Sequence, residues 1–148
     1  MTEMSLDFEG RITCHLDFIL RGITFDPEEA TRALELVPSQ SFRAGESYRL
    51  RSGAERSRPW SVWHFSSEAA GLGDDLDAHA RYLLANLEPK ANRISYLRAK
   101  ADFSTIWIWW ESNQNTASFA LRTDVVRRLA ALADELSFSV IASSDDEA

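Results

Sequence analysis

The chain has 148 residues, of which 45% are hydrophobic and 26% are charged, and its formal net charge is −7. This length and composition predict one globular domain with a single core, and they exclude a chain that is disordered over most of its length. The negative charge disfavours binding to duplex DNA and to anionic membranes. Because Cys14 is the one cysteine, an intrachain disulfide and a cysteine-rich metal site are also excluded.

The N-terminal stretch carries acidic residues where a signal peptide needs Lys or Arg, and no apolar run approaches the roughly 20 residues that span a bilayer. We therefore expect a soluble, cytoplasmic protein without a membrane segment. Residues 1–10 are expected to form an N-terminal tail, residues 11–142 a single α+β domain, and residues 143–148 an acidic, disordered tail.

Apolar and polar residues alternate over residues 11–21, which predicts a half-buried strand. His15 and Asp17 belong to its outward side. The inward side comprises Ile12, Cys14, Leu16, Phe18 and Leu20.

A helix is predicted directly after this strand. Asp26 is placed to cap it and Pro27 occupies its first turn, so we expect it to run to about Leu36, before Pro38. Residues 39–59 are polar and contain Gly and Pro, which indicates a long loop or an irregular hairpin.

Residues 60–66 are the next predicted strand. A second helix is expected to begin at Asp74 or Asp75 and to break at Pro89, with a short helical piece after the break.

Residues 103–110 and 117–122 are predicted to form a hairpin around a polar turn. Thr123 is then expected to cap a third helix, and residues 138–142 to form the last strand. This order predicts an α+β fold, in which an antiparallel or mixed sheet carries helices on one face as a ferredoxin-like sandwich. The pattern F-x-L-R occurs at residues 18–21 and 119–122, which raises the hypothesis that a strand-helix-strand unit is duplicated.

Three tryptophans lie within four residues of the strand that contains Ile106 and Ile108. Successive side chains of a strand point to opposite faces, so we expect the two isoleucines and Trp110 to face the helices and Trp107 and Trp109 to face away. The two indoles would form an apolar patch of about 400 Å². Arginine side chains of the same chain, a homodimer through the open sheet face, or another protein or stacking ligand could each cover it.

A loop rich in arginine precedes the tryptophans of the 60–66 strand. Together with Trp63, these cations would suit a weak anion site for a nucleotide or single-stranded RNA. A solvated loop whose arginines pair with acidic neighbours is the simpler interpretation. The arginines are Arg43, Arg49, Arg51, Arg56 and Arg58.

No motif of a nucleophilic, phosphate-binding or dinucleotide-binding site occurs in the sequence. His15, Asp17 and His64 would form a metal site if their strands were neighbours, yet no paired histidine spacing supports it. His79 is expected at the boundary of its helix and Cys14 in the core. We therefore predict no catalytic residue, no metal and no cofactor.

Several short segments occur along the chain in a recognisable order. They are Phe25–Thr31, Leu34–Ser39, Phe42–Glu46, Trp60–Trp63, Leu76–His79 and Leu87–Pro89. In this order they resemble a bacterial family known as domain of unknown function forty-two seventy-nine. The resemblance covers roughly residues 12–142 and implies an α+β domain. Phe42, where many members have Trp, departs from the family pattern.

These observations favour a non-enzymatic protein-binding domain, of the kind that an immunity protein uses to neutralise a basic toxin. Trp107, Trp109, His15 and Asp17 are its predicted contact residues. The alternatives are a nucleotide or single-stranded RNA binder that uses the loop 43–58, and a metal-dependent enzyme that uses His15, Asp17 and His64.

Overall fold

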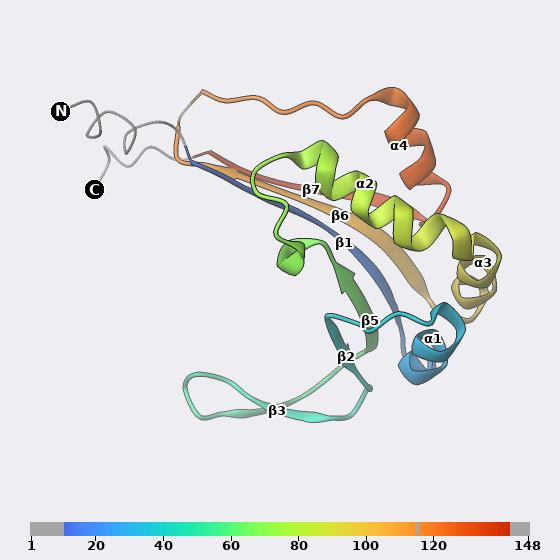
Figure 1. Ribbon diagram of the computed structural model, residues 1–148. Helices are drawn as coiled ribbons and strands as arrows, with labels where there is room; N and C mark the ends of the chain where they lie inside the picture. Colours follow the sequence, from blue (N-terminus) through green and yellow to red (C-terminus); the bar gives the residue numbers. More distant parts are fainter. Residues whose placement is uncertain (1–10, 115, 143–148) are drawn as a thin grey trace.

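A curved five-stranded sheet with helices on its convex face organises the computed structural model, which describes residues 11–114 and 116–142 (Figure 1). The predicted tails, residues 1–10 and 143–148, lie outside the described residues. The strand order is β2-β5-β1-β6-β7. These strands are β1 (Ile12–Gly22), β2 (Gln40–Phe42), β5 (Ser61–Ser66), β6 (Phe103–Ser112) and β7 (Glu135–Ala142).

The sheet is mixed. Strand β1 pairs antiparallel with both β5 and β6, and β2 pairs antiparallel with β5. Strand β7 runs parallel to β6. Since a parallel partner needs a crossover connection, the chain leaves β6, passes through α4 (Thr123–Ala130) and returns to the sheet as β7.

Two helices begin at predicted caps, Asp26 and Asp75. The predicted cap of the third helix is wrong, because Thr123 is the first residue of that helix and follows its N-cap, Arg122. Asp26 Oδ1 accepts a hydrogen bond of 3.0 Å from the Glu28 backbone N–H, and Asp75 Oδ1 accepts one of 3.0 Å from that of Asp77. The first helix ends earlier than expected, because Glu35 adopts a left-handed conformation with φ 53°. This first helix is α1 (Pro27–Leu34). It is followed by α2 (Leu76–Leu87) and α3 (Ala91–Lys100), with Pro89 in a short 3₁₀ turn between these two.

The core lies between the helices and the convex face of the sheet. Leu16, Phe18 and Leu20 of β1 are fully buried, as are Ile106 and Ile108 of β6, so the predicted alternation of both strands is confirmed. Each such side chain contributes about 1.5–3 kcal/mol by leaving water. The predicted α+β class, with helices on one face of the sheet, is therefore observed.

The loop at 39–59 contains a small two-stranded sheet, formed by β3 (Ser47–Arg49) and β4 (Glu55–Ser57). This hairpin projects on the concave side of the main sheet, opposite the helices (Figure 1). The Arg58 guanidinium lies 4.0 Å from the ring centres of both Phe42 and Tyr48, which fixes the base of the hairpin.

The predicted returning strand at residues 117–122 is wrong, because this segment has no regular secondary structure. The place beside β6 is taken by β7. The ring of Phe119 packs 5.3 Å from that of Trp110, so the apolar alternation of the segment reflects packing on the sheet without a ladder. The repeated F-x-L-R pattern therefore falls in β1 at one site and outside any strand at the other, which does not support duplication.

A buried serine and histidine tie β1 to the connection between β5 and α2. Ser67 Oγ accepts a hydrogen bond from the Leu16 backbone N–H at 2.9 Å, and it lies 2.7 Å from His79 Nδ1. His79 Nε2 lies 2.9 Å from the Gly73 carbonyl oxygen, which can only accept, so Nε2 carries the proton and Nδ1 accepts from Ser67. His79 is 2% exposed and Ser67 is fully buried. The pair is thus a structural link, and His79 lies deeper than its expected boundary position.

Ser67→Ala should lower the free energy of unfolding by about 2–4 kcal/mol, because it leaves the Leu16 N–H and His79 Nδ1 buried without partners. Ser52→Ala, at an exposed site in the hairpin, is the matched control and should change stability by less than about 0.5 kcal/mol. Chemical denaturation followed by circular dichroism measures both. Equal stability of the two variants would contradict a structural role for this link.

Candidate functional site

The concave face of the sheet, which the helices leave uncovered, carries the predicted tryptophans. Ile106 and Ile108 are fully buried and Trp110 is 2% exposed on the convex side. Trp107 and Trp109 are only partly buried and alternate with them on the concave side. The predicted orientation of all five side chains is therefore confirmed.

The two indoles form one aromatic surface with a histidine. Their ring centres are 6.0 Å apart at an interplanar angle of 70°, an edge-to-face arrangement. Trp109 stacks on His15, with 6.0 Å between ring centres and an angle of 8°. Trp107 Nε1 donates a hydrogen bond of 2.8 Å to Ser139 Oγ. Neighbouring strands therefore hold both indoles in defined orientations.

Three polar residues from two neighbouring strands, His15 and Asp17 of β1 and His64 of β5, meet beside the indoles. His15 Nδ1 lies 3.1 Å from Asp17 Oδ1, and His64 Nε2 lies 3.3 Å from the same oxygen. The second pair is close enough for an ion pair but not aligned for a hydrogen bond, so the buried Nε2 of His64 has no hydrogen-bond partner in the described part of the chain. The register explains the meeting: β1 pairs with β5 so that His64 is opposite Ile19, two residues beyond Asp17.

The Asp17 carboxylate is 4% exposed although it lies on the uncovered face. Burial alone would raise the pKa of Asp17. Polar contacts with His64 and Ser66 and the charges of His15 and His64 outweigh burial and lower that pKa below its usual value of 3.8. Asp17 is therefore a carboxylate at neutral pH, held between two imidazoles.

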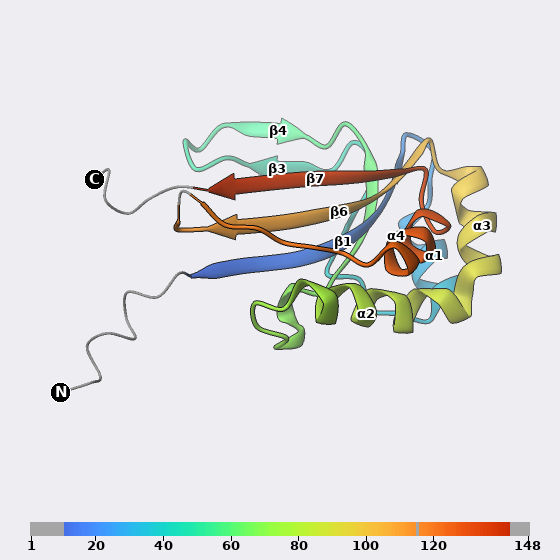
Figure 2. The same cartoon turned by 90° about the horizontal axis from the view of Figure 1, so that it is seen from above.

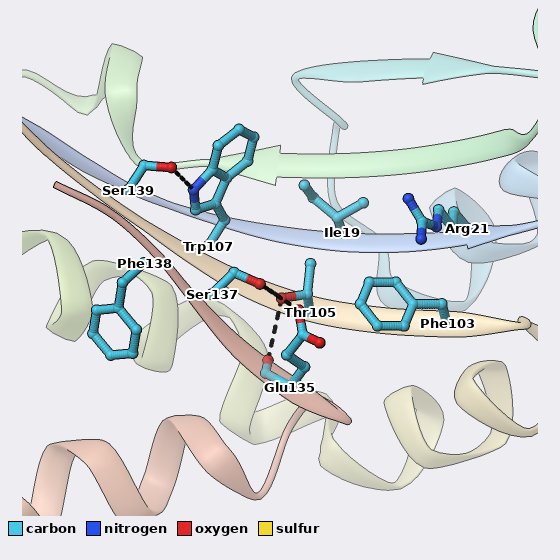
Figure 3. A pocket seen from close by; sticks show the side chains of 9 residues that line it. All are labelled: Ile19, Arg21, Phe103, Thr105, Trp107, Glu135, Ser137, Phe138 and Ser139. Atoms are coloured by element: carbon cyan, nitrogen blue, oxygen red, sulfur yellow. Dashed lines mark hydrogen bonds between the residues drawn. The ribbon is translucent and has the colours of Figure 1, made fainter. Parts of the chain in front are cut away.

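A hollow of about 530 Å³ opens on the same face, next to Trp107. Figure 3 shows Trp107 and Phe103 toward its two ends, with Thr105 and Ser137 between them. The hollow is lined by Ile19, Arg21, Phe103, Thr105, Trp107, Glu135, Ser137, Phe138 and Ser139.

The hollow combines hydroxyl groups, a carboxylate and aromatic rings. Thr105 Oγ1 lies 2.8 Å from Ser137 Oγ and 3.3 Å from the Glu135 carbonyl oxygen (Figure 3). Ser137 Oγ also donates to a side-chain oxygen of Glu135. At the Phe103 end, the Arg21 guanidinium lies 4.6 Å from the centre of that ring. The hollow thus offers one carboxylate, one guanidinium and hydroxyl groups beside aromatic rings.

Sequence reasoning missed most of the hollow. Its polar lining comes from serines at alternate positions of β7, whose neighbours in space depend on the parallel pairing with β6. The alternation of Ser137 and Ser139 indicates one polar face of this strand. The sequence does not show that this strand pairs with β6, and so it does not place the serines beside Thr105 and Trp107.

The arginine-rich loop does not cover the tryptophans. Arg21 lies over Trp60 and Phe103, and Arg58 over Phe42 and Tyr48, so no stacked arginine among the described residues lies over Trp107 or Trp109.

Three of the loop arginines are already engaged. Arg58 is stacked, Arg43 pairs with Asp26 at 2.9 Å, and Arg49 pairs with Glu55 at 3.6 Å. Arg51 and Arg56 are exposed.

The prediction that Trp63 belongs to an anion site is wrong. It is fully buried in the core, because it lies opposite Leu20 on the convex side of the sheet. Its Nε1 donates a hydrogen bond of 3.0 Å to Thr31 Oγ1. An indole in that position packs between sheet and α1 and cannot stack on a ligand.

Within residues 11–114 and 116–142, no three His, Cys, Asp or Glu side chains are arranged to hold a metal ion. His15 and His64 reach one oxygen of Asp17 from neighbouring strands, so the predicted three residues converge without forming a ligand set. In the same ranges, none of the helices has the length and apolar character needed to cross a membrane.

Asp17→Asn should lower the free energy of unfolding at neutral pH by about 1–3 kcal/mol, because it removes a charged hydrogen-bonding group. The folded-state pKa lies below 3.8. The stabilisation from the carboxylate is therefore present above about pH 3.8 and is lost as the pH falls through the folded-state value. Denaturation curves between acid and neutral pH should show a smaller acid-induced loss in the variant than in the wild type.

Asp74→Asn, at an exposed carboxylate, is the control and should change neutral-pH stability by less than about 0.5 kcal/mol. If Asp17→Asn is as stable as this control, the contacts of Asp17 with the two histidines contribute nothing to the fold.

A family model described as a domain of unknown function, DUF4279, matches residues 12–143. No curated protein and no solved structure matches the chain. Since the matched residues include every helix and strand of the described fold, the chain belongs to the DUF4279 family.

Proposed function

We propose that this chain is a protein-binding domain that receives a basic partner on the concave face of its sheet. The observation that carries the proposal is the joint presence of the two indoles and the hollow on the one sheet face that helices do not cover. Aromatic anchors beside a pocket are typical of the residues that dominate binding energy at protein interfaces.

The charges on the strands of the main sheet support a basic partner at this face. Strand positions that point to the concave side carry the carboxylates of Asp17, Glu111 and Glu135 and one guanidinium, that of Arg21. The Arg21 guanidinium is stacked on Phe103 at one end of the hollow, and the Glu135 carboxylate borders the hollow beside Ser137. A Lys or Arg side chain of the partner would meet a carboxylate, the hydroxyl groups of Thr105, Ser137 and Ser139 and the Trp107 ring there. The net charge of −7 would also attract a basic protein at long range.

A basic toxin that the chain neutralises by direct binding is the specific partner we propose. Such a function needs no catalytic group, only a surface that is complementary to the toxin and stable without it. A pull-down with this chain as bait should capture such a partner. If the captured partner is toxic when expressed alone and harmless when expressed with this chain, the immunity role is supported.

The alternative proposal, nucleotide or single-stranded RNA binding by residues 43–58, has less support. Arg43, Arg49 and Arg58 already contact carboxylates or aromatic rings, and Trp63 lies in the core. The second alternative is a metal-dependent enzyme that uses His15, Asp17 and His64. These three residues lie close together, but the described part of the chain does not arrange them as a metal-ligand set.

Trp107→Ser should weaken binding of the captured basic partner about 30-fold or more, because an anchor of this kind contributes about 2 kcal/mol or more. Glu135→Lys should also weaken this binding, and more strongly at low salt, since the substitution places a positive charge against a basic partner. Isothermal titration calorimetry at two salt concentrations measures both effects.

Tyr96→Ser is the matched control, because Tyr96 is an exposed aromatic residue on α3, outside the concave face. It should leave the affinity unchanged. The proposal fails if Trp107→Ser stays folded by circular dichroism and binds the partner as tightly as this control.

A further inference from the structure

The outer edge of β7 has no strand partner within the part of the chain that the structure describes. β7 is last in the strand order and is paired through β6 alone. Figure 2 shows it running along β6 over its whole length, on the side away from β1. Such an edge presents backbone N–H and C=O groups that can pair with a strand of another molecule.

The composition of this edge does not protect it from pairing. Residues 136–142 contain no charged residue, proline or glycine. Phe138, Val140 and Ile141 are 52%, 53% and 38% exposed, so apolar side chains on both faces of the strand remain in water. Proteins usually protect edge strands by charges, proline or shortness. The opposite edge strand, β2, has only three residues and is protected in that way.

We propose that β7 pairs with β7 of a second copy of this chain, the two strands running antiparallel about a two-fold axis perpendicular to the sheet. The occupant is a second copy because one strand then supplies both sides of a symmetric interface. Both helix layers would lie on the same side of the joined sheet, since the axis does not exchange its faces.

The side chains select the register. Residues opposite each other must point to the same face, so only registers that pair even with even and odd with odd numbers are allowed. A register centred on Ser139 sets Phe138 opposite Val140 of the second copy, and the same pair occurs again across the axis. It also sets Ser137 opposite Ile141 and leaves Glu135 outside the stretch 136–142. A register centred on Phe138 would instead place the Glu135 carboxylate opposite Ile141.

The pairing ends with two copies. Each β7 edge is used once, and the short β2 edge does not continue the sheet. Because Glu135, Ser137 and Ser139 line the hollow, the dimer would bring two hollows together on one concave face. This inference goes beyond the proposed binding function and does not depend on it.

Analytical ultracentrifugation of the full chain over a wide concentration range should show a reversible dimer. Val140→Lys should weaken the dimer by at least about tenfold, because it adds a charge to each of two symmetric contacts. Val37→Lys is the matched control, since Val37 is 85% exposed in the loop after α1, and it should leave the dimer intact. A wild-type chain that stays monomeric throughout, or equal effects of the two variants, would overturn the proposal.

Ser139→Cys tests the register. Residues directly opposite on the two-fold axis have Cα atoms about 4.5–5.5 Å apart, which suits a disulfide. Oxidation should therefore link Ser139→Cys into a covalent dimer. Ser137→Cys, on the same face but away from the axis, should not link. The native Cys14 does not interfere, because it is buried and burial raises its pKa to about 11. Linkage at residue 137 in place of residue 139 would overturn the proposed pairing.

Discussion

The alternation of side chains along β6 decides which large residues of the sheet lie beneath the helices and which remain on the uncovered face. A strand places successive residues on opposite faces, so a segment with Ile106, Trp107, Ile108, Trp109 and Trp110 cannot bury all of its large side chains in one core. The convex side takes the isoleucines and Trp110 beneath the helices. The concave side keeps two indoles, and this division creates an aromatic surface opposite the helix layer.

Neighbouring strands give that surface its chemistry. β1 pairs with β6 so that Asp17 is opposite Trp107 and His15 opposite Trp109. β5 then supplies His64 to the same carboxylate, and β7 supplies the serine that fixes the Trp107 indole. His15 and Ser139 thus orient the two indole rings, and the two histidines keep the Asp17 carboxylate charged although it is nearly buried. A partner that covers this face would bury aromatic area whose orientation is already set, which reduces the entropy lost on binding.

Local patterns were enough to predict much of the fold. The caps at Asp26 and Asp75, the break at Pro89 and the two faces of β1 and β6 follow from side-chain chemistry and periodicity within a few residues. The segment 117–122 was misassigned because Phe119 and Leu121 alternate as in a strand, while the actual neighbour of β6 comes later in the chain. The hollow and the position of Trp63 depend on register and on parallel pairing, and neither is encoded in a local pattern.

We propose that a partner binds the surface formed by Trp107 and Trp109. Hydroxyl-radical footprinting of the tryptophans, in the free chain and in the complex, can test this. Trp107 and Trp109 should react in the free chain and become protected in the complex, while Trp63 and Trp110 should be unreactive in both. Protection confined to Trp60, or strong reactivity of Trp63 in the free chain, would contradict it.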